Sequence, residues 1–260
     1  MPSLELTNAV MEFDDAGAGS PVLLLHGFPA TRYLWSQVIP LLVGRGMRAI
    51  APDLVGYGSS APRPGMRIDM ASQAGWMWEL LDALELQRIF LVAHDVGSAV
   101  AQLMVAASPA RVRGLVILDG VYETEWAMDA IESIRQWDTA EAHRLFPVLL
   151  RRLGKSQHLR EMLAAYAGDA GGRRLIEAAR DLEPGQTAAI GQSLRASRIP
   201  SLVLWGRDDR YLDVDAVARP LAQLLSAPLA ILAGGHFTPS DCPKELSDAV
   251  CDFIVAHAGE

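Results

Sequence analysis

One aspartate lies where a side chain could react. Asp95 is the middle residue of Ala93-His94-Asp95-Val96-Gly97, which follows a short apolar segment and precedes a helical pattern. Small residues at both ends of this pentapeptide allow a tight strand-to-helix turn that lifts the central side chain away from the backbone. A carboxylate with a pKa of about 4 is ionised at neutral pH, so it can attack saturated carbon without a general base and form an alkyl-enzyme ester. The alternative is that Asp95 only caps the helix.

Other segments with reactive or small residues lie beside predicted strands. Each combines a histidine or an aspartate with glycine, aromatic or hydroxyl residues. They are His26-Gly27-Phe28-Pro29, Asp53-Leu54-Val55-Gly56-Tyr57-Gly58-Ser59-Ser60, Trp205-Gly206-Arg207-Asp208-Asp209 and Gly234-Gly235-His236-Phe237.

In this order, the segments resemble those of the α/β-hydrolase fold superfamily, in its aspartate-nucleophile branch of epoxide hydrolases and dehalogenases. The pentapeptide is similar to the G-x-S-x-G elbow, with aspartate for serine and alanine for the first glycine. The run from His26 through Tyr33 and Trp35 looks like H-G-F-P-x-x-x-Y-x-W, and the segment from Asp53 resembles D-L-x-G-x-G-x-S. The resemblance covers residues from about 21 to 120 and from 199 to 257.

The resemblance implies a role for each of five residues. Asp95 is expected to be the nucleophile, His236 the base that activates water, and Asp209 the acid that orients the histidine. The backbone N–H groups of Phe28 and Val96 are expected to form the oxyanion hole. Two other acids could take the place of Asp209, namely the adjacent Asp208 and Asp119 at the end of an earlier strand. His26 and Asp53 are expected to shape their loops.

The possible activities differ in the leaving group that the enzyme must stabilise. An epoxide hydrolase is the leading hypothesis, and the alternative is a haloalkane or haloacetate dehalogenase. An epoxide needs a proton donor, whereas a halide needs N–H donors, and Val96 replaces the tryptophan that often follows the nucleophile in dehalogenases. A third class is a non-hydrolytic cyclase or lyase, or a ligand-binding module, with Asp95 as base or anchor; an unusual esterase or lactonase also stays open. The expected substrate-binding residues are Trp35, Tyr122, Trp126, His143 and Tyr166.

These residues must be positioned by alternating strands and helices. Continuously apolar strands between helices predict a mostly parallel, doubly wound sheet covered on both faces. Residues 1–13 predict an antiparallel edge strand or hairpin. Between residues 121 and 197 the pattern is helical, with breaks expected at Gly168, Gly171-Gly172 and Pro184-Gly185. We therefore expect an α/β-hydrolase core of residues 1–120 and 198–260, with a helical cap of residues 121–197 inserted between two strands. The predicted strands are 22–25, 48–51, 89–93, 115–118, 201–205 and 229–232; the predicted core helices are 33–44, 69–86, 97–108, 215–225 and 243–257.

The composition is that of a globular chain of 260 residues with 50% hydrophobic residues and a net charge of −8. An acidic surface opposes nucleic acid as a partner. The two cysteines, Cys242 and Cys251, indicate neither a disulfide framework nor a zinc site. No dinucleotide fingerprint, phosphate loop or metal cluster is evident, so no cofactor is expected. With neither a signal peptide nor a run of 18 apolar residues, the expectation is a cytoplasmic enzyme for a small molecule, without membrane contact; a homodimer is left open.

Overall fold

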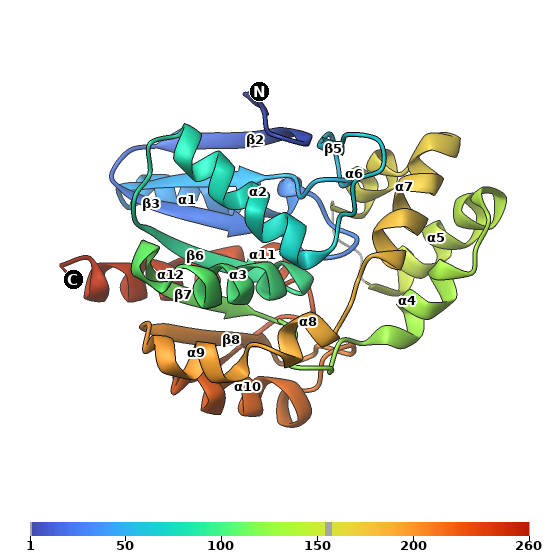
Figure 1. The fold of residues 1–260 in the computed structure, drawn as a ribbon. Helices are drawn as coiled ribbons and strands as arrows, with labels where there is room; N and C mark the ends of the chain where they lie inside the picture. The colour runs from blue at the N-terminus through green and yellow to red at the C-terminus, as the bar shows by residue number, and fades with distance from the viewer. Residues whose placement is uncertain (1, 154–157, 260) are drawn as a thin grey trace.

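A nine-stranded, mostly parallel sheet forms the centre of the molecule. The computed structural model describes residues 2–153 and 158–259 (Figure 1). The strand order is β1-β2-β4-β3-β6-β7-β8-β9, and β5 pairs with β2. The strands are β1 (Ser3–Glu5), β2 (Ala9–Gly17), β3 (Ser20–Leu25), β4 (Met47–Pro52), β5 (Ala61–Pro62), β6 (Ile89–His94), β7 (Val112–Leu118), β8 (Ser201–Gly206) and β9 (Leu229–Leu232).

The parallel part of the sheet consists of β4, β3, β6, β7, β8 and β9, as predicted. β6 is buried at every residue and the last five residues of β7 are buried too, which fits strands covered on both faces. β1 and β2 form the antiparallel hairpin expected at the N-terminus, and β2 continues antiparallel to β4. Because the carboxyl ends of parallel strands share one edge, the segments that follow β3, β4, β6, β7, β8 and β9 all meet there.

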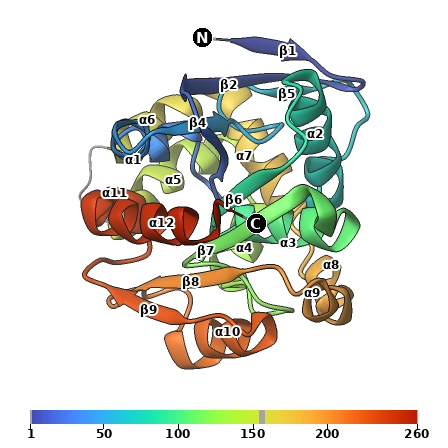
Figure 2. The same cartoon turned by 90° about the vertical axis from the view of Figure 1, so that its left-hand side faces the viewer.

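Helices cover both faces of the sheet. Figure 2 shows α1 (Val38–Gly44) and α12 (Pro243–His257) on one side, with the short α11 (Thr238–Asp241) beside α12. On the other side lie α2 (Met70–Ala83) and α3 (Val96–Ala107). Asp69 caps α2 by accepting a hydrogen bond from the amide of Ser72, as its sequence position predicts.

Two predicted core helices are each divided in the structure. The predicted helix 33–44 is a 3₁₀ turn, η1 (Arg32–Trp35), followed by α1. The predicted helix 215–225 is a π-helical turn, η3 (Val214–Ala218), followed by α10 (Arg219–Leu225). Pro40 and Pro220 lie in the first turns of α1 and α10, where the missing N–H costs little, and neither can donate to the carbonyl four residues earlier, which favours a break before each helix.

The insertion between β7 and β8 is entirely helical where the structure describes regular elements. Helices α4 (Met128–Arg135), α5 (Thr139–Leu153), α6 (His158–Ala165) and α7 (Gly168–Arg180) gather at one end of the sheet (Figure 1). The expected break at Gly171-Gly172 was wrong, because both glycines lie inside α7. A Cβ atom on Gly171 would overlap the backbone of Tyr166, so glycine there allows the two helices to approach closely.

The last two helices of the insertion lie against the core. Helices α8 (Gly185–Ala188) and α9 (Gly191–Ser197) lie near α3 and α10 rather than with α4–α7 (Figure 1). The cap over the carboxyl edge therefore consists of α4–α7. Within the described ranges, none of the helices is both long and apolar enough to cross a membrane.

Candidate active site

Asp95 occupies a sharp turn between β6 and α3. Its φ of 51° and ψ of −129° lie outside the regions that non-glycine residues usually adopt, which costs on the order of 1–3 kcal/mol. Gly97 makes the turn possible, because a Cβ atom there would clash with the carbonyl oxygen of His26 and lie 2.8 Å from that of Leu25. The Asp95 side chain makes no capping hydrogen bond to α3. The helix-cap alternative is therefore not the arrangement found.

The Asp95 carboxylate faces backbone amides instead. The N–H of Phe28 donates to its Oδ1 at 2.7 Å, and a Cβ atom on Gly27 would overlap the same side chain. Burial raises the pKa of Asp95 above its usual 3.8, while the positive charge of His236 and the amides of Val96 and Phe28 oppose this shift. Of the two amides expected from the sequence to form an oxyanion hole, that of Phe28 donates to this carboxylate, and that of Val96 lowers its pKa.

His236 follows β9 and lies between two aspartates. Its Nδ1–H donates to Oδ2 of Asp209 at 2.9 Å, and its Nε2 lies 3.7 Å from Oδ2 of Asp95. Burial alone would lower the pKa of His236, but the carboxylates of Asp209, Asp95 and Asp119 raise it to about 9. In the unreacted protein the imidazole is therefore protonated at neutral pH.

Asp209 is fixed by two further hydrogen bonds. Its side chain is fully buried, and its Oδ1 accepts the amides of Tyr211 at 2.8 Å and Leu212 at 3.2 Å. Between the two alternative acids, Asp208 is exposed. Asp119 is buried, but it accepts hydrogen bonds from Gly206 and Thr238 at 2.6 Å each and makes none to His236. The acid that contacts the histidine is Asp209.

His26 holds the loop that carries Phe28. Its Nδ1–H donates to the carbonyl of Gly27 at 3.0 Å, and its Nε2 accepts the amide of Leu54 at 2.9 Å. Burial lowers its pKa, so the ring is neutral, as this pair of hydrogen bonds requires. His26 thus joins the loops after β3 and β4.

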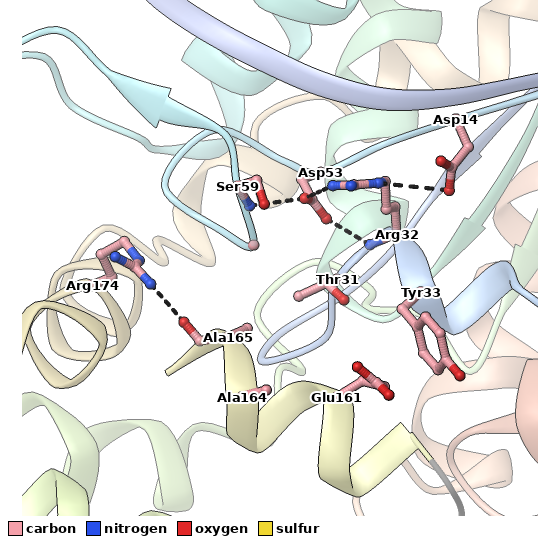
Figure 3. A pocket seen from close by; sticks show the side chains of 11 residues that line it. Asp14, Thr31, Arg32, Tyr33, Asp53, Ser59, Glu161, Ala164, Ala165 and Arg174 are labelled. Carbon is pink, nitrogen blue, oxygen red and sulfur yellow. Dashed lines mark hydrogen bonds and ion pairs between the residues drawn. The ribbon is translucent and has the colours of Figure 1, made fainter. Parts of the chain in front are cut away.

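Asp53 holds the same loops from the outer side. It accepts the amides of Arg32 at 2.8 Å and Ser59 at 2.9 Å and forms a buried ion pair with the Arg32 guanidinium, which also faces Asp14 (Figure 3). A cleft of about 490 Å³ opens between these residues and the cap, lined on the cap side by Glu161, Ala164, Ala165 and Arg174.

Two buried tyrosines, one in the cap and one in the core, have hydroxyls without a described partner. Tyr166 follows α6, packs edge-to-face on Phe146 with ring centroids 5.2 Å apart, and has a hydroxyl without a partner among the described residues. Tyr57 is fully buried, and its hydroxyl also lacks a described partner. Its ring contacts those of His26 and Phe28 edge-on, at 5.4 and 6.4 Å. Burial is the largest cause of the raised pKa of Tyr57, and the charges of Tyr166 and Asp95 raise it further.

Tyr57 was missed in the sequence. It lies in the glycine-rich segment after β4, and the available signal was that this segment leaves the same edge of the sheet as Asp95. Tyr166, by contrast, was among the expected substrate-binding residues. Burial raises the pKa of both phenols above the usual value of about 10, so both hydroxyls keep their protons at neutral pH.

The remaining expected substrate-binding residues lie in other surroundings. The Tyr122 hydroxyl donates to Glu123 at 3.0 Å. The Trp126 indole N–H is shared between the Glu123 carbonyl at 3.0 Å and the Thr187 hydroxyl at 3.1 Å. His143 is exposed, with Nδ1 3.9 Å from Asp169. Trp35 is fully buried in the core. No contact that the structure describes places these four, or Tyr166, against the Asp95 carboxylate.

Comparisons with known proteins agree with this fold. Residues 20–144 match the family model described as alpha/beta hydrolase fold. A haloalkane dehalogenase from Mesorhizobium japonicum is 25% identical over 96% of this chain and 90% of its own length. The haloalkane dehalogenase DbeA from Bradyrhizobium elkani superposes with a TM-score of 0.86 and 25% identity, covering 99% of this chain and 98% of that one. The epoxide hydrolase CorEH, at 22% identity and a TM-score of 0.81 over 98% of both chains, shows the same fold.

Proposed function

Because this chain is a hydrolase of the α/β-hydrolase fold superfamily, in the branch of the haloalkane dehalogenases and epoxide hydrolases, we propose that it hydrolyses epoxides with Asp95 as the nucleophile. One observation carries the proposal: a buried carboxylate stands on the strand-to-helix turn where hydrolases of this fold carry a nucleophile. Two contacts support the proposal: Phe28 donates a hydrogen bond to Oδ1 of Asp95, and Nε2 of His236 lies 3.7 Å from its Oδ2.

In the first step, the carboxylate of Asp95 attacks a ring carbon of the epoxide. Oδ2, which accepts no hydrogen bond from Phe28, forms the new C–O bond, and the ring C–O bond breaks with its electron pair on the departing oxygen. That alkoxide is a stronger base than a phenolate, so it takes the proton of a tyrosine hydroxyl. Tyr166 from the cap and Tyr57 from the core are the available donors, since neither hydroxyl has another described partner.

In the second step, His236 activates water against the ester. Alkylation removes the negative charge of Asp95, one of the charges that raise the pKa of His236, so the imidazole becomes a better-matched base in the intermediate. The proton that Nε2 of His236 carries in the free protein first passes to the phenolate left by the first step, which restores the tyrosine and leaves the imidazole neutral. Water then adds to Cγ of Asp95 and gives its proton to Nε2. Oδ1 then carries the developing charge and lies within hydrogen-bond distance of the Phe28 amide. On collapse the departing alkoxide takes the proton of the imidazolium and leaves as the diol, and the carboxylic acid formed on Asp95 returns its proton to His236, which restores the carboxylate.

The donors favour an epoxide over a halide. Neither Val96 nor Phe28 carries a side-chain N–H, and the indole N–H of Trp126 already has two acceptors. The buried hydroxyls of Tyr57 and Tyr166 have no described partner; the buried indole N–H of Trp35 has none either, but Trp35 lies in the core. Haloalkane dehalogenase activity is the second candidate, favoured by the similarity to the Mesorhizobium enzyme over nearly the whole chain.

The test is to trap the ester. His236→Gln should form the intermediate but not hydrolyse it, so incubation with a small epoxide should add the mass of that epoxide to the peptide that contains Asp95. Asp95→Asn is the matched control and should remain unmodified. An adduct with a haloalkane, together with halide release, would favour the second candidate. If neither substrate class modifies His236→Gln, an alkyl-enzyme mechanism is ruled out.

A further inference from the structure

A second buried histidine, His94, packs against His236. His94 is the last residue of β6, immediately before Asp95, and it is fully buried. Its Nε2 lies 2.7 Å from the backbone carbonyl oxygen of His236. The two imidazole rings have centroids 4.9 Å apart, and the ring of Phe237 lies 5.6 Å from that of His94. The strand that carries the nucleophile is thus hydrogen-bonded to the peptide of the base.

The protonation of His94 follows from this contact. A carbonyl oxygen only accepts, so Nε2 carries the hydrogen and Nδ1 is an acceptor. Burial and the neighbouring charge of His236 lower the pKa of His94 far below its usual value, which keeps the ring neutral. Nδ1 has no donor among the described residues, and an unsatisfied buried group costs about 1–3 kcal/mol. An apolar side chain would avoid this cost, so packing alone does not account for a histidine here.

Among the described residues, the other hydrogen bonds that hold the backbone of the loop around His236 are made by neighbours of that residue and not by its own peptide group. The carbonyl of Gly234 accepts the amide of Asp208, the amide of Gly235 donates to Asp241, and the hydroxyl of Thr238 donates to Asp119. Asp209 holds the His236 ring, but a ring held at one nitrogen can still shift with its backbone. His94 is the contact at the His236 peptide itself.

We propose that His94 is a positioning residue for His236, and that its hydrogen bond fixes where Nε2 lies relative to the Asp95 carboxylate. This inference rests on the proposed function. The His94 hydrogen bond should matter for only one of the two steps. Attack by Asp95 needs no base, whereas hydrolysis of the ester needs Nε2 aligned with water. Loss of the hydrogen bond should therefore slow hydrolysis and leave alkylation nearly unchanged.

The experiment compares two amides that differ in length. The Nε2–H₂ group of glutamine can occupy the position of histidine Nε2, whereas asparagine is one methylene shorter and cannot reach the His236 carbonyl. The substrate is whichever epoxide or haloalkane modifies His236→Gln. With His94→Asn and His94→Leu we expect hydrolysis to slow roughly 10- to 100-fold and the ester on Asp95 to become the main species during turnover. His94→Gln should hydrolyse the ester within a few-fold of the parent protein.

His257→Leu is the matched control. His257 also bonds a backbone carbonyl, that of Phe253 at 2.8 Å, and packs on the ring of the same residue at 4.6 Å, but near the end of α12. It should leave both steps unchanged. Equal losses in alkylation and hydrolysis, or the same behaviour for glutamine and asparagine at position 94, would overturn the inference.

The outcomes separate the two proposals. If the leucine variant does not fold, the glutamine and asparagine pair still decides, because both keep a polar amide in the strand. An adduct on His236→Gln without ester accumulation in His94→Asn would contradict only the role of His94. The absence of an adduct on His236→Gln would contradict the proposed function itself.

Discussion

The charge of Asp95 is one of three that set the basicity of His236. The carboxylate of Asp209 contributes most to the rise of the histidine pKa to about 9, those of Asp95 and Asp119 add to it, and the proposed ester would remove the charge of Asp95. The imidazole is therefore protonated before the first step of the proposed reaction. After that step its pKa is lower, so it is a weaker base. This order suits the two steps, since the cation stabilises the ionised nucleophile and the neutral ring is required only for hydrolysis.

The two steps should therefore respond differently to pH. Alkylation needs an ionised Asp95, whose pKa is raised above 3.8, so its rate should fall only in acid. Hydrolysis needs neutral His236, so its rate should rise with pH through the pKa of the histidine in the ester, which lies below the value of about 9 in the free protein. Single-turnover measurements between about pH 5 and 10 should show the ester accumulating at the acidic end. An ester fraction independent of pH would contradict the assignment of His236 as the base.

Removing the hydroxyl of Tyr57 or of Tyr166 should slow alkylation without lowering stability. Tyr166→Phe and Tyr57→Phe should each lower the rate of alkylation by an epoxide, about 10²- to 10⁴-fold for a principal donor. The free energy of unfolding should not fall, because neither hydroxyl has a described partner to lose. Chemical denaturation and stopped-flow alkylation would measure the two quantities.

Tyr122→Phe is the control for these variants, because its hydroxyl bonds Glu123 instead. It should leave alkylation unchanged. A haloalkane that alkylates Asp95 at the same rate in all three variants would assign the tyrosines to the epoxide leaving group. Unchanged epoxide alkylation in both Tyr57→Phe and Tyr166→Phe would remove these residues from the mechanism.

At the scale of elements, close approach between β3 and α3 makes the turn at Asp95. Gly97→Ala should therefore be destabilising by about 1–3 kcal/mol and should lower alkylation, because the new Cβ would force α3 away from the carbonyls of Leu25 and His26. Gly75→Ala is the matched control in the exposed face of α2, where no atom lies within 4 Å of the new Cβ. Helix propensity predicts a gain of roughly 0.5–1 kcal/mol there. Equal effects of the two substitutions in thermal unfolding would contradict this account.

The core elements could be predicted from the sequence, whereas the orientation of the cap could not. Continuous apolar runs such as β6 identify strands buried on both faces, and parallel pairing then brings Asp95, Asp209 and His236 to one edge. The surroundings of His143 depend on how α5 is rotated about its axis, which no local pattern determines. Its exposure is therefore visible only in the structure. The same holds for the position of Tyr57, which is set by packing on His26 and Phe28.

At the scale of the molecule, the cap is attached to the core close to the site. Asp181 at the end of α7 accepts the amide of Ile68 at 2.7 Å. Ile68 is buried and packs over Gly56, where a Cβ atom would lie 2.6 Å from its side chain. Tyr57 follows at once, and the charge of Asp181 contributes to raising the pKa of that tyrosine. One hydrogen bond thus links the cap to the loop that holds a proposed proton donor.

Breaking this link should loosen substrate binding without disturbing Asp95, His236 and Asp209. Asp181→Ala leaves the Ile68 amide unpaired, so we expect the free energy of unfolding to fall by about 1–3 kcal/mol and KM to rise more than kcat falls. Hydrogen exchange at the Ile68 amide should accelerate, because that amide loses its acceptor. Glu183→Gln is the control, since Glu183 only pairs with the exposed Arg67 at 2.6 Å, a contact worth about 0–1 kcal/mol. If Ile68 were equally protected in both variants, the cap would have to be held by other contacts, and KM should then be unchanged in Asp181→Ala as well.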